Sequence, residues 1–347
     1  MKIYLNGKFS LVKMTGVQRV AVELIKAIRV ESEKTQDFSI EVLYPPSFIA
    51  HSRFRAAWSL LWEQLILPWH CRDGLLLSLC NTGPIFLRKQ VLVLHDAAVF
   101  DMPGNYSWKY VLVQKLMMRL HALCKKTIYT VSSFSQQRLS SALGIPANEI
   151  GKLVLGCEHV HNARADFTIL DKLKLRSGEY MLAVGSLQPG KNFDLLVKLA
   201  ERQVSFPIVV VGGVDPSVFG GIDNQRKSAL RYAGYVSDEE LEALFSSARC
   251  YIQPSFYEGF GLPVLEAMAR GIPVLCSNAA SLPEVGGDAV LYFSPDNVDE
   301  LDKLVSTVVD DAEAMAHLSE AGKLRAQGFS WTRSAEIFID QILSLKR

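Results

Sequence analysis

The sequence predicts an α/β protein made of two doubly wound domains. Short apolar runs alternate with longer helical patterns, which is typical of βαβ units whose parallel sheets are covered by helices on both faces. With 347 residues, the chain is long for a single core and sufficient for two domains of ordinary size. The weakest periodicity lies near residues 156–177, where we expect the linker between the domains.

The apolar runs, taken in order along the chain, predict ten strands in two series. The first series lies at residues 3–5, 40–44, 75–79, 91–94 and 127–131, and the second at 180–184, 208–211, 250–252, 273–275 and 289–292. Helical patterns lie between them, for instance at residues 17–29, 108–123, 192–202, 239–247 and 262–270. Ser237, with Glu240 three residues on, predicts a capping box at the start of one helix. We therefore expect an N-terminal domain at residues 1–165 and a C-terminal domain at 166–331.

Two glutamates, Glu258 and Glu266, flank a glycine-bearing segment that opens a predicted helix. Pro263 suits the first position of this helix, and Gly271 suits its end. Between the glutamates, the backbone N–H groups of residues 259–262 point outward at the positive end of the helix, which is a binding site for phosphate. Carboxylates accept hydrogen bonds from sugar hydroxyls. This order of groups predicts a site for a sugar nucleotide, with one acid on the hexose, amides on the diphosphate and one acid on the ribose.

This Glu-x7-Glu segment resembles the signature of retaining glycosyltransferases of family 4, which have the two-domain GT-B fold. The resemblance covers most of the chain and is carried by further motifs: TGVQR at 15–19, His95-Asp96, VSSFS at 131–135, GSLQPGKN at 185–192, GYVSD at 234–238 and LPEV at 282–285. It implies two Rossmann-like domains that face each other across a cleft, with the last helix, at residues 332–347, packed back on the first domain. It is most similar to bacterial mannosyltransferases of surface-polysaccharide biosynthesis, of O-antigen or exopolysaccharide.

Small and polar residues follow several predicted strands. They are His95-Asp96, Gly185-Ser186, Gly212-Gly213 and Gln253-Pro254-Ser255. Because ligands of open parallel sheets bind beyond the carboxyl ends of the strands, these positions are expected to line the site. No Gly-x-Gly-x-x-Gly fingerprint is present, which argues against a dinucleotide-binding dehydrogenase.

The donor site follows from these positions and from the resemblance. Lys191, at the start of a helix after a glycine-bearing turn, is predicted to bind the diphosphate, although a lone lysine is usually solvated. Glu258 is assigned to the donor sugar, Glu266 to the ribose, and a strand at 234–236 to the base pocket. Gly16 lets the backbone approach the diphosphate, unless it only forms a tight turn. The full predicted set of donor-binding residues is Gly16, Gly185, Ser186, Lys191, Tyr235, Val236, Glu258, Gly259, Phe260, Gly261, Leu262 and Glu266.

His95 resembles the family histidine that faces the transferred sugar, so the predicted catalytic set is Glu258, His95 and Lys191. A lone histidine is more often structural, but this one ends a strand beside a carboxylate. Asp96 is expected to position His95 or to shape the acceptor pocket. Arg19 is either a charge on a helix face or an acceptor contact.

No metal or other cofactor is expected. His159 and His161 lack a third ligand and are interpreted as linker surface, and the Asp-x-Asp motif of metal-dependent transferases does not occur. The family often carries an arginine beside the diphosphate lysine, but Ser186 and Gly190 occupy those places here. Either Lys191 and the amides act alone, or another arginine substitutes, with Arg226 and Arg231 the nearest in sequence.

Composition restricts the location and the partners. Lys and Arg number 37 against 36 Asp and Glu, so no global charge attracts nucleic acid. No apolar run approaches the ~18 residues of a membrane span, no signal peptide is seen, and the six cysteines are scattered. These features predict a cytoplasmic protein. Residues 51–62 and 108–119 mix basic with aromatic and aliphatic residues, which core packing explains, although peripheral contact with the inner face of the cytoplasmic membrane is an alternative.

The resemblance to family 4 thus implies a retaining hexosyltransferase that uses a nucleoside-diphosphate sugar and a glycan or lipid-linked acceptor. GDP-mannose is the favoured donor. UDP-glucose, UDP-GlcNAc or a deoxysugar nucleotide are alternatives, as is a catalytically silent sugar-nucleotide binder that regulates an assembly complex. Such a binder is expected to lose Lys191 or one of the glutamates, and all three are present.

Overall fold

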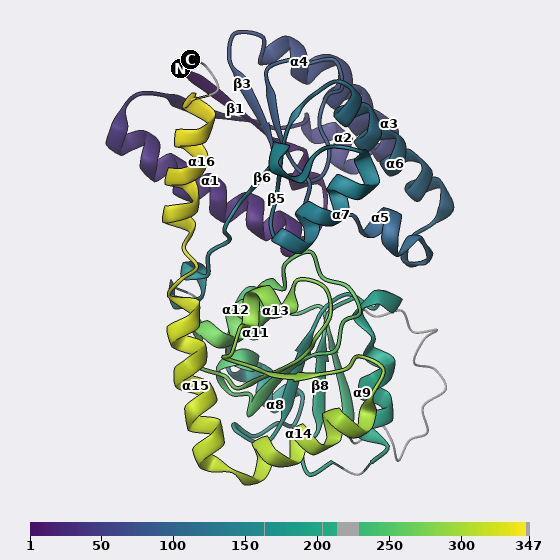
Figure 1. The fold of residues 1–347 in the computed structure, drawn as a ribbon, viewed down its shortest axis with the longest axis vertical. Helices are drawn as coiled ribbons and strands as arrows, with labels where there is room; N and C mark the ends of the chain where they lie inside the picture. Colours follow the sequence, from purple (N-terminus) through teal and green to yellow (C-terminus); the bar gives the residue numbers. More distant parts are fainter. Residues whose placement is uncertain (163, 203, 214–228, 345–347) are drawn as a thin grey trace. The chain divides into compact units, whose positions relative to one another are not determined.

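The computed structural model describes residues 1–162, 164–202, 204–213 and 229–344, which form two compact units (Figure 1). The first unit comprises Met1–Gly156 together with the segment that begins at Ser330, and the second is Cys157–Phe329. The first boundary therefore lies nine residues before the expected residue 165. The reason is that residues just after Gly156 contact the second unit: the Cys157 thiol donates to the Ala326 carbonyl at 3.7 Å.

The first unit is built on a six-stranded parallel sheet in the order β2-β1-β3-β4-β5-β6. Its strands are β1 (Lys2–Asn6), β2 (Ser39–Leu43), β3 (Leu75–Ser78), β4 (Gln90–Val93), β5 (Thr127–Thr130) and β6 (Ile150–Lys152). The first five match the predicted runs, whereas β6 was not predicted. It is only three residues long, and Gly151 at its centre and Lys152 interrupt any apolar pattern.

Helices cover both faces of this sheet (Figure 1). They are α1 (Gly16–Thr35), α2 (Ser47–His51), α3 (Arg55–Leu61), the π-helical η2 (Trp62–Ile66), α4 (Leu67–His70), α5 (Ala98–Asp101), α6 (Trp108–Leu123), α7 (Ser133–Leu143) and α16 (Trp331–Ser344), with short 3-10 turns η1 (Gly7–Leu11), η3 (Pro103–Asn105) and η4 (Ala147–Glu149). On one face α1 packs on α16, whose Phe338 ring contacts Tyr129 of β5 edge-on at 4.9 Å between centroids. On the other face, Trp62 and Leu67 pack on Leu76, and Met118 packs on Leu92.

The second unit repeats this architecture, with a parallel sheet in the order β12-β11-β10-β7-β8-β9. Its strands are β7 (Met181–Val184), β8 (Ile208–Val211), β9 (Leu230–Gly234), β10 (Cys250–Gln253), β11 (Val274–Ser277) and β12 (Leu291–Phe293). The predicted strand at 234–236 is wrong, because β9 ends where it was expected to begin. Gly234 has φ +69°, a left-handed conformation that ends the extended chain, so Tyr235 and Val236 lie in the following loop.

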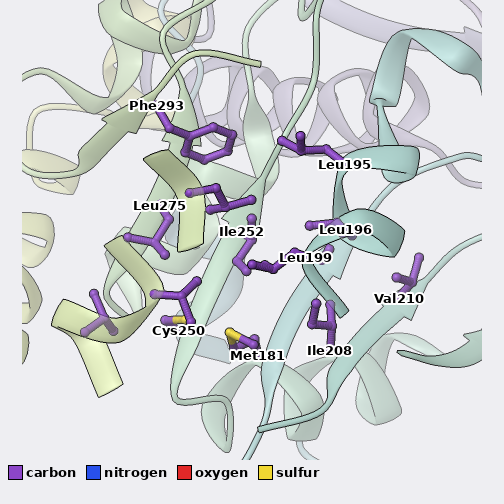
Figure 2. Close-up of a cluster of buried hydrophobic side chains, with 14 of the residues drawn as sticks. Met181, Leu195, Leu196, Leu199, Ile208, Val210, Cys250, Ile252, Leu275 and Phe293 are labelled. Atoms are coloured by element: carbon purple, nitrogen blue, oxygen red, sulfur yellow. The ribbon is translucent and has the colours of Figure 1, made fainter. Parts of the chain in front are cut away.

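The core of the second unit lies between the sheet and its helices. These are η5 (Glu158–Asn162), α8 (Thr168–Lys172), η6 (Pro189–Lys191), α9 (Phe193–Ala200), α11 (Asp238–Ser246), α12 (Leu262–Ala269), α13 (Leu282–Gly286), α14 (Val298–Asp310) and α15 (Ala312–Ala326). Figure 2 shows the cluster beneath α9, in which Leu196 and Leu199 contact apolar residues of the central strands such as Met181, Ile208 and Ile252. On the opposite face, the Phe245 ring of α11 packs on Tyr251 of β10. Both faces of the four central strands, β7, β8, β10 and β11, are therefore buried, as the continuous apolar runs predicted, whereas the edge strands β9 and β12 are only partly buried.

Local signals in the sequence mark the starts and the end of helices in the second unit. The capping box is present at α11, where the Ser237 side chain accepts from the Glu240 backbone and the Glu240 side chain accepts in return. Gly271, with φ +71°, closes α12 in a Schellman motif in which Ile272 N–H donates to the Ala267 carbonyl. Pro263 lies second in α12 rather than first, still within the turn whose N–H groups have no partner in the helix.

Candidate active site

Glycines cluster where three neighbouring strands of the second sheet end. Gly185 follows β7, Gly212 follows β8 and Gly234 ends β9. Gly212 has φ +142°, and a Cβ there would lie 1.9 Å from the Gly185 carbonyl oxygen, so no other residue fits. The result is a surface of bare backbone at the carboxyl edge of the sheet, the position at which open parallel sheets bind ligands.

Lys191 and Glu258 meet at this edge. The Lys191 ammonium donates to both carboxylate oxygens of Glu258, at 2.7 and 2.8 Å, although the two residues are 67 positions apart. The side chains are 24% and 10% exposed, so the pair is largely shielded from water. Gly185 lies beside them, since a Cβ at that residue would be 3.6 Å from the Lys191 side chain. The structure thus brings together three residues that the sequence assigned to the donor.

Further side chains, not predicted from the sequence, orient Glu258. Gln253 Nε2 donates to Glu258 Oε1 at 2.8 Å, and Ser255 Oγ donates to the same oxygen at 2.7 Å. Ser281 Oγ lies 2.8 Å from the Glu258 carbonyl and 2.9 Å from that of Phe260, and it donates to this pair of backbone oxygens. Gln253 and Ser255 follow a predicted strand, which was the available signal, but Ser281 comes from a distant segment.

The segment between the two glutamates opens α12. Gly261 is its N-cap, with φ +103°, and a Cβ at this position would lie 2.7 Å from the buried Leu282 side chain. Phe260 is buried and packs edge-on against Phe329, at 5.9 Å between ring centroids. Leu262 is the first helical residue. Because no side chain caps α12, its first N–H groups remain available, and a helix start of this kind attracts an anion.

Glu266, one turn into α12, bonds to a histidine rather than standing free. His159 Nε2 lies 2.8 Å from Glu266 Oε1, and the two side chains are 12% and 13% exposed. The interpretation of His159 as linker surface is therefore wrong. The physical reason is that the His159 side chain reaches Glu266 of α12, 107 positions away, a contact that the weak periodicity of the segment did not reveal. His161, two residues on, is exposed.

Tyr235 and Val236 lie at the same edge, beyond β9. Tyr235 is 64% exposed, and its hydroxyl lies close to Gly213, where an added Cβ would be 2.6 Å from the hydroxyl oxygen. An exposed aromatic ring beside bare backbone is a surface on which a planar base can stack. These residues form a loop and not the expected strand, and their role in a base pocket stays a prediction.

The remaining predicted residues belong to the first unit, and His95 is buried there after β4. Its Nε2 lies 2.8 Å from the Leu79 carbonyl, which can only accept, so Nε2 carries the proton. Burial lowers the pKa of His95 to about 4, which keeps the imidazole neutral at physiological pH. Its backbone N–H donates to Asn81 Oδ1 at 2.7 Å, so the unpredicted loop after β3 holds this histidine in place.

Gly16 lies at the same edge of the first sheet as His95. It is the first residue of α1, and a Cβ there would meet nothing within 4 Å. The Cys80 thiol donates to the Val17 carbonyl at 3.8 Å, so the loop that holds His95 also contacts the start of α1. Gly16 is therefore not required by packing, which favours the reading that its bare backbone serves a ligand.

The two residues assigned to the acceptor have structural partners. Asp96 Oδ1 accepts from the Ala98 backbone at 2.8 Å, just before α5. Arg19 Nη1 lies 3.9 Å from Glu23 one turn further along α1. Neither contact excludes a ligand, because both side chains are at the edge where Gly16 and His95 lie.

The question of a substitute arginine is answered for one candidate. Arg231 donates to the Leu173 and Lys174 carbonyls at 2.8 and 2.7 Å, which commits it to the backbone, and Arg226 lies outside the described residues. Within the described ranges no group of three or more His, Cys, Asp or Glu side chains is placed to hold a metal ion. Nor, across the same ranges, does any helix combine the length and apolarity needed to cross a membrane.

Fold and site together define a glycosyltransferase of the GT-B type. Residues 168–325 match the family of group 1 glycosyl transferases. Over 359 aligned residues the chain is 31% identical to the O-antigen chain mannosyltransferase B of Escherichia coli, with 92% of this chain and 93% of that protein covered. The chain belongs to this family, and the predicted family-4 assignment is confirmed.

Other relatives and solved structures agree. The O-antigen chain mannosyltransferase RfbU of Salmonella typhimurium is 25% identical over 305 residues, covering 84% of this chain and 83% of that one. The fold resembles that of Anabaena HepE, solved with UDP and glucose, with a TM-score of 0.72 at 15% identity over 99% of this chain and 100% of that one. WaaG, a glycosyltransferase involved in lipopolysaccharide biosynthesis, gives the same score and identity over 99% of both chains. The predicted α/β GT-B fold is confirmed.

Proposed function

We propose that this glycosyltransferase moves a hexose from a nucleoside-diphosphate sugar to a hydroxyl group of a glycan or lipid-linked glycan, with retention of configuration and without a metal or other cofactor. The observation that carries the proposal is the meeting of Lys191, Glu258 and the uncapped start of α12 at one edge of the second sheet. Mannose from GDP-mannose is the favoured donor, because two of the relatives are O-antigen mannosyltransferases.

The proposed donor contacts use the groups at that edge. The diphosphate binds Lys191 Nζ and the N–H groups of residues 259–262, the ribose hydroxyls donate to Glu266, and the base lies beside Tyr235. A diphosphate brings a competing anion to Lys191, which frees oxygens of Glu258 to accept from hydroxyls of the sugar. The cation and the amides then stabilise the negative charge that develops as the nucleoside diphosphate leaves.

In the proposed reaction, the bond between the anomeric carbon and the β-phosphate oxygen breaks, and the bond to the acceptor oxygen forms on the same face of the sugar. The acceptor proton passes to the departing phosphate oxygen. We assign no protein nucleophile, because we expect Glu258 to lie on the hydroxyl side of the ring. Neutral His95 is assigned to the transferred sugar, and Asp96 and Arg19 to the acceptor.

UDP-glucose is the second candidate donor, since a structurally similar protein, HepE, was solved with it. A thermal-shift comparison of GDP-mannose, UDP-glucose and UDP-GlcNAc separates the candidates, because stabilisation grows with the ratio of ligand to its dissociation constant. We expect the largest rise in Tm with GDP-mannose. A larger rise in Tm with UDP-glucose would assign that sugar nucleotide as the donor. No rise with any sugar nucleotide would contradict the proposal that this edge of the sheet binds the donor. The proposal includes a cytoplasmic location, where such donors are available, with peripheral contact at the inner face of the membrane.

A further inference from the structure

Glu63 of η2 is a fully buried carboxylate near the carboxyl edge of the first sheet. Its Oε1 accepts from Asn6 Nδ2 and from the Thr82 hydroxyl, both at 2.9 Å. Its Oε2 accepts from Lys8 Nζ at 2.7 Å. Burying a charged pair is costly, and apolar residues of similar volume are often as stabilising or more so. The stability of the core alone therefore does not explain an acid at this position.

Two of the partners of Glu63 belong to the loop that leads from β1 to α1. Asn6 is the last residue of β1, and its Oδ1 accepts from the Lys8 backbone N–H at 3.1 Å, which caps η1. The Lys8 side chain, 23% exposed, crosses from this loop to the carboxylate. Glu63 thus holds the start of the segment that ends at Gly16.

The third partner belongs to the loop after β3. Thr82 donates to Glu63 from this loop, and Gln64, the next residue of η2, holds the same loop at two further points. Gln64 Nε2 donates to the Gly83 carbonyl at 3.1 Å, and its Oε1 accepts from the Ile85 backbone N–H at 3.0 Å. One short segment of η2 therefore fixes both loops.

The loop after β3 is also the loop that holds His95. Asn81, the neighbour of Thr82, accepts the His95 backbone N–H at 2.7 Å, and the Leu79 carbonyl accepts from His95 Nε2 at 2.8 Å. Asn81 has φ +63°, a conformation that a side chain keeps only where its surroundings hold it. The bond from Thr82 to Glu63 supplies such a hold one residue away.

The same loop contacts the start of α1 through Cys80. Burial, with a contribution from the nearby Glu63 carboxylate, raises the pKa of the Cys80 thiol to about 12. The thiol therefore stays protonated and donates to the Val17 carbonyl at 3.8 Å, next to Gly16. Both loops and the start of α1 thus form one connected set of contacts around the carboxylate.

The helix that carries Glu63 is itself unusual and firmly anchored. In η2 the Leu67 N–H donates to the Trp62 carbonyl five residues earlier, the pattern of a π-helix, which is rare and frequent at functional sites. Trp62 and Leu67 are buried in one apolar cluster with Leu76 of β3. Glu63 is therefore presented to the loops from a rigid part of the core.

We infer that Glu63 is a positioning residue for sugar transfer, which holds the loops after β1 and β3 so that His95 and Gly16 keep one arrangement at the ligand edge of the first sheet. The inference rests on the proposed transferase function and deepens it. Glu63 is not assigned to catalysis, because its fully buried carboxylate is occupied by three donors of the protein and acts through His95 and Gly16.

Kinetics of Glu63→Gln test the inference. The substitution keeps the size of the side chain but leaves one oxygen for three donors, so at least one loop is released. We expect kcat to fall about tenfold or more, because small displacements of positioned groups carry a large cost in rate. Affinity for nucleoside diphosphate should be nearly unchanged, since its main proposed contacts lie on the second unit. Adding Lys8→Met removes the ammonium that faces the new amide and should restore most of the rate.

Two controls separate positioning from stability. Phe338→Leu destabilises the first unit from the opposite face of the sheet, and Asp73→Asn changes a carboxylate that binds Lys2 Nζ at 2.7 Å and the Tyr4 hydroxyl at 2.8 Å near the other end of β1. Compared at a temperature at which each variant is folded, both should keep the parental kcat. A loss of kcat in Phe338→Leu as large as that in Glu63→Gln would overturn the inference.

The proton on His95 Nε2 gives a readout that does not depend on transfer. Its NMR signal, in protein with isotope-labelled histidine, is assigned by its loss in His95→Gln. We expect the signal to shift or broaden in Glu63→Gln and in Thr82→Val, and to stay as in the parent in Phe338→Leu. Thr82→Val, which removes only one hydroxyl, serves where Glu63→Gln does not fold. An unchanged signal in the folded variants would overturn the inference. A parent that transfers no sugar while the signal responds would support the link to His95 and contradict the transferase proposal.

Discussion

Lys191 has two anionic partners in the proposed cycle, Glu258 before the donor binds and the diphosphate afterwards. With Arg231 committed to backbone carbonyls, Lys191 is the main diphosphate cation of the proposal. Lys191→Ala should therefore lower kcat/KM by well over tenfold, with Lys198→Ala, on the exposed side of α9, as the control. A loss under tenfold, or ~1.4 kcal/mol of transition-state stabilisation, would place the main cation elsewhere. The variant also leaves Glu258 without its cation, so a folded state should be verified first.

The two glutamates should separate nucleotide binding from sugar transfer. Glu266→Ala should weaken the binding of free nucleoside diphosphate, because ribose hydroxyls lose an acceptor at a typical cost of ~1–3 kcal/mol. Glu258→Ala should leave this affinity nearly unchanged and lower turnover, the pattern of an interaction that strengthens in the transition state. Calorimetry measures the first quantity and initial rates the second. Glu320→Ala, on exposed α15, is the control, and equal effects of the two active-site substitutions on both quantities would contradict the division.

Two buried histidines should make the first unit sensitive to acid. Burial lowers the pKa of His95 to about 4 and that of His121, with help from nearby Lys126, to about 4. Between pH 6.5 and 4 the unfolded chain binds more protons than the folded chain, so the free energy of unfolding falls as pH falls through this range. Each histidine contributes at most about 3 kcal/mol to this loss, and neither contributes above pH 7.

Tryptophan fluorescence during urea unfolding measures this effect in the first unit alone, because that unit holds all five tryptophans. His95→Gln should flatten the dependence of the urea midpoint on pH between 4 and 6.5. His317, exposed on α15 of the second unit, supplies the control substitution His317→Gln, which should change nothing. An unchanged pH dependence in His95→Gln would mean that His95 does not titrate as its burial implies.

The start of α12 depends on a backbone conformation that a single methyl group disturbs. Gly261→Ala would place a Cβ at φ +103° and 2.7 Å from Leu282, so we expect the second unit to lose about 1–2 kcal/mol of stability. Gly16→Ala should leave stability unchanged, because nothing lies within 4 Å of its Cβ, and should weaken donor binding if the backbone must approach the diphosphate. Thermal unfolding with and without nucleoside diphosphate measures both. Equal stability of Gly261→Ala and the parent would show that the turn relaxes freely.

The sequence predicted the order of elements well, because the spacing of apolar residues within each segment indicates a strand or a helix without reference to the rest of the chain. All ten predicted strands are present, and the glutamate motif gave the turn before α12 and both carboxylates. β6 and β9 were missed or misplaced, because short strands that end in Gly or Lys lack a pattern. The partners of the glutamates were mostly missed for a different reason. His159 meets Glu266 across 107 positions, and Ser281 meets Glu258 across 23, and only the folded chain brings such residues together.

For the enzyme as a whole, the proposed chemistry predicts the anomeric configuration of the product and the response of turnover to a chelator. NMR of the anomeric carbon should show the configuration of the donor, because the acceptor attacks on the face from which phosphate departs. A chelator should leave turnover unchanged, since Lys191 and the amides supply the positive charge. An inverted product would remove the same-face mechanism, and complete loss with chelator, restored by a divalent ion, would contradict the metal-free proposal.

The path of the chain between its two units has a consequence for biosynthesis. The chain leaves the first unit after Gly156 and returns at Ser330, and α16 then packs against α1. On the ribosome, the second unit is therefore synthesised in full before the first can acquire its last helix, so the unit begun first is finished last. Until then one face of α1, and the Tyr129 ring that Phe338 covers, remain exposed to chaperones and proteases. The second unit, in contrast, is one uninterrupted stretch of chain that can close on itself as soon as it emerges.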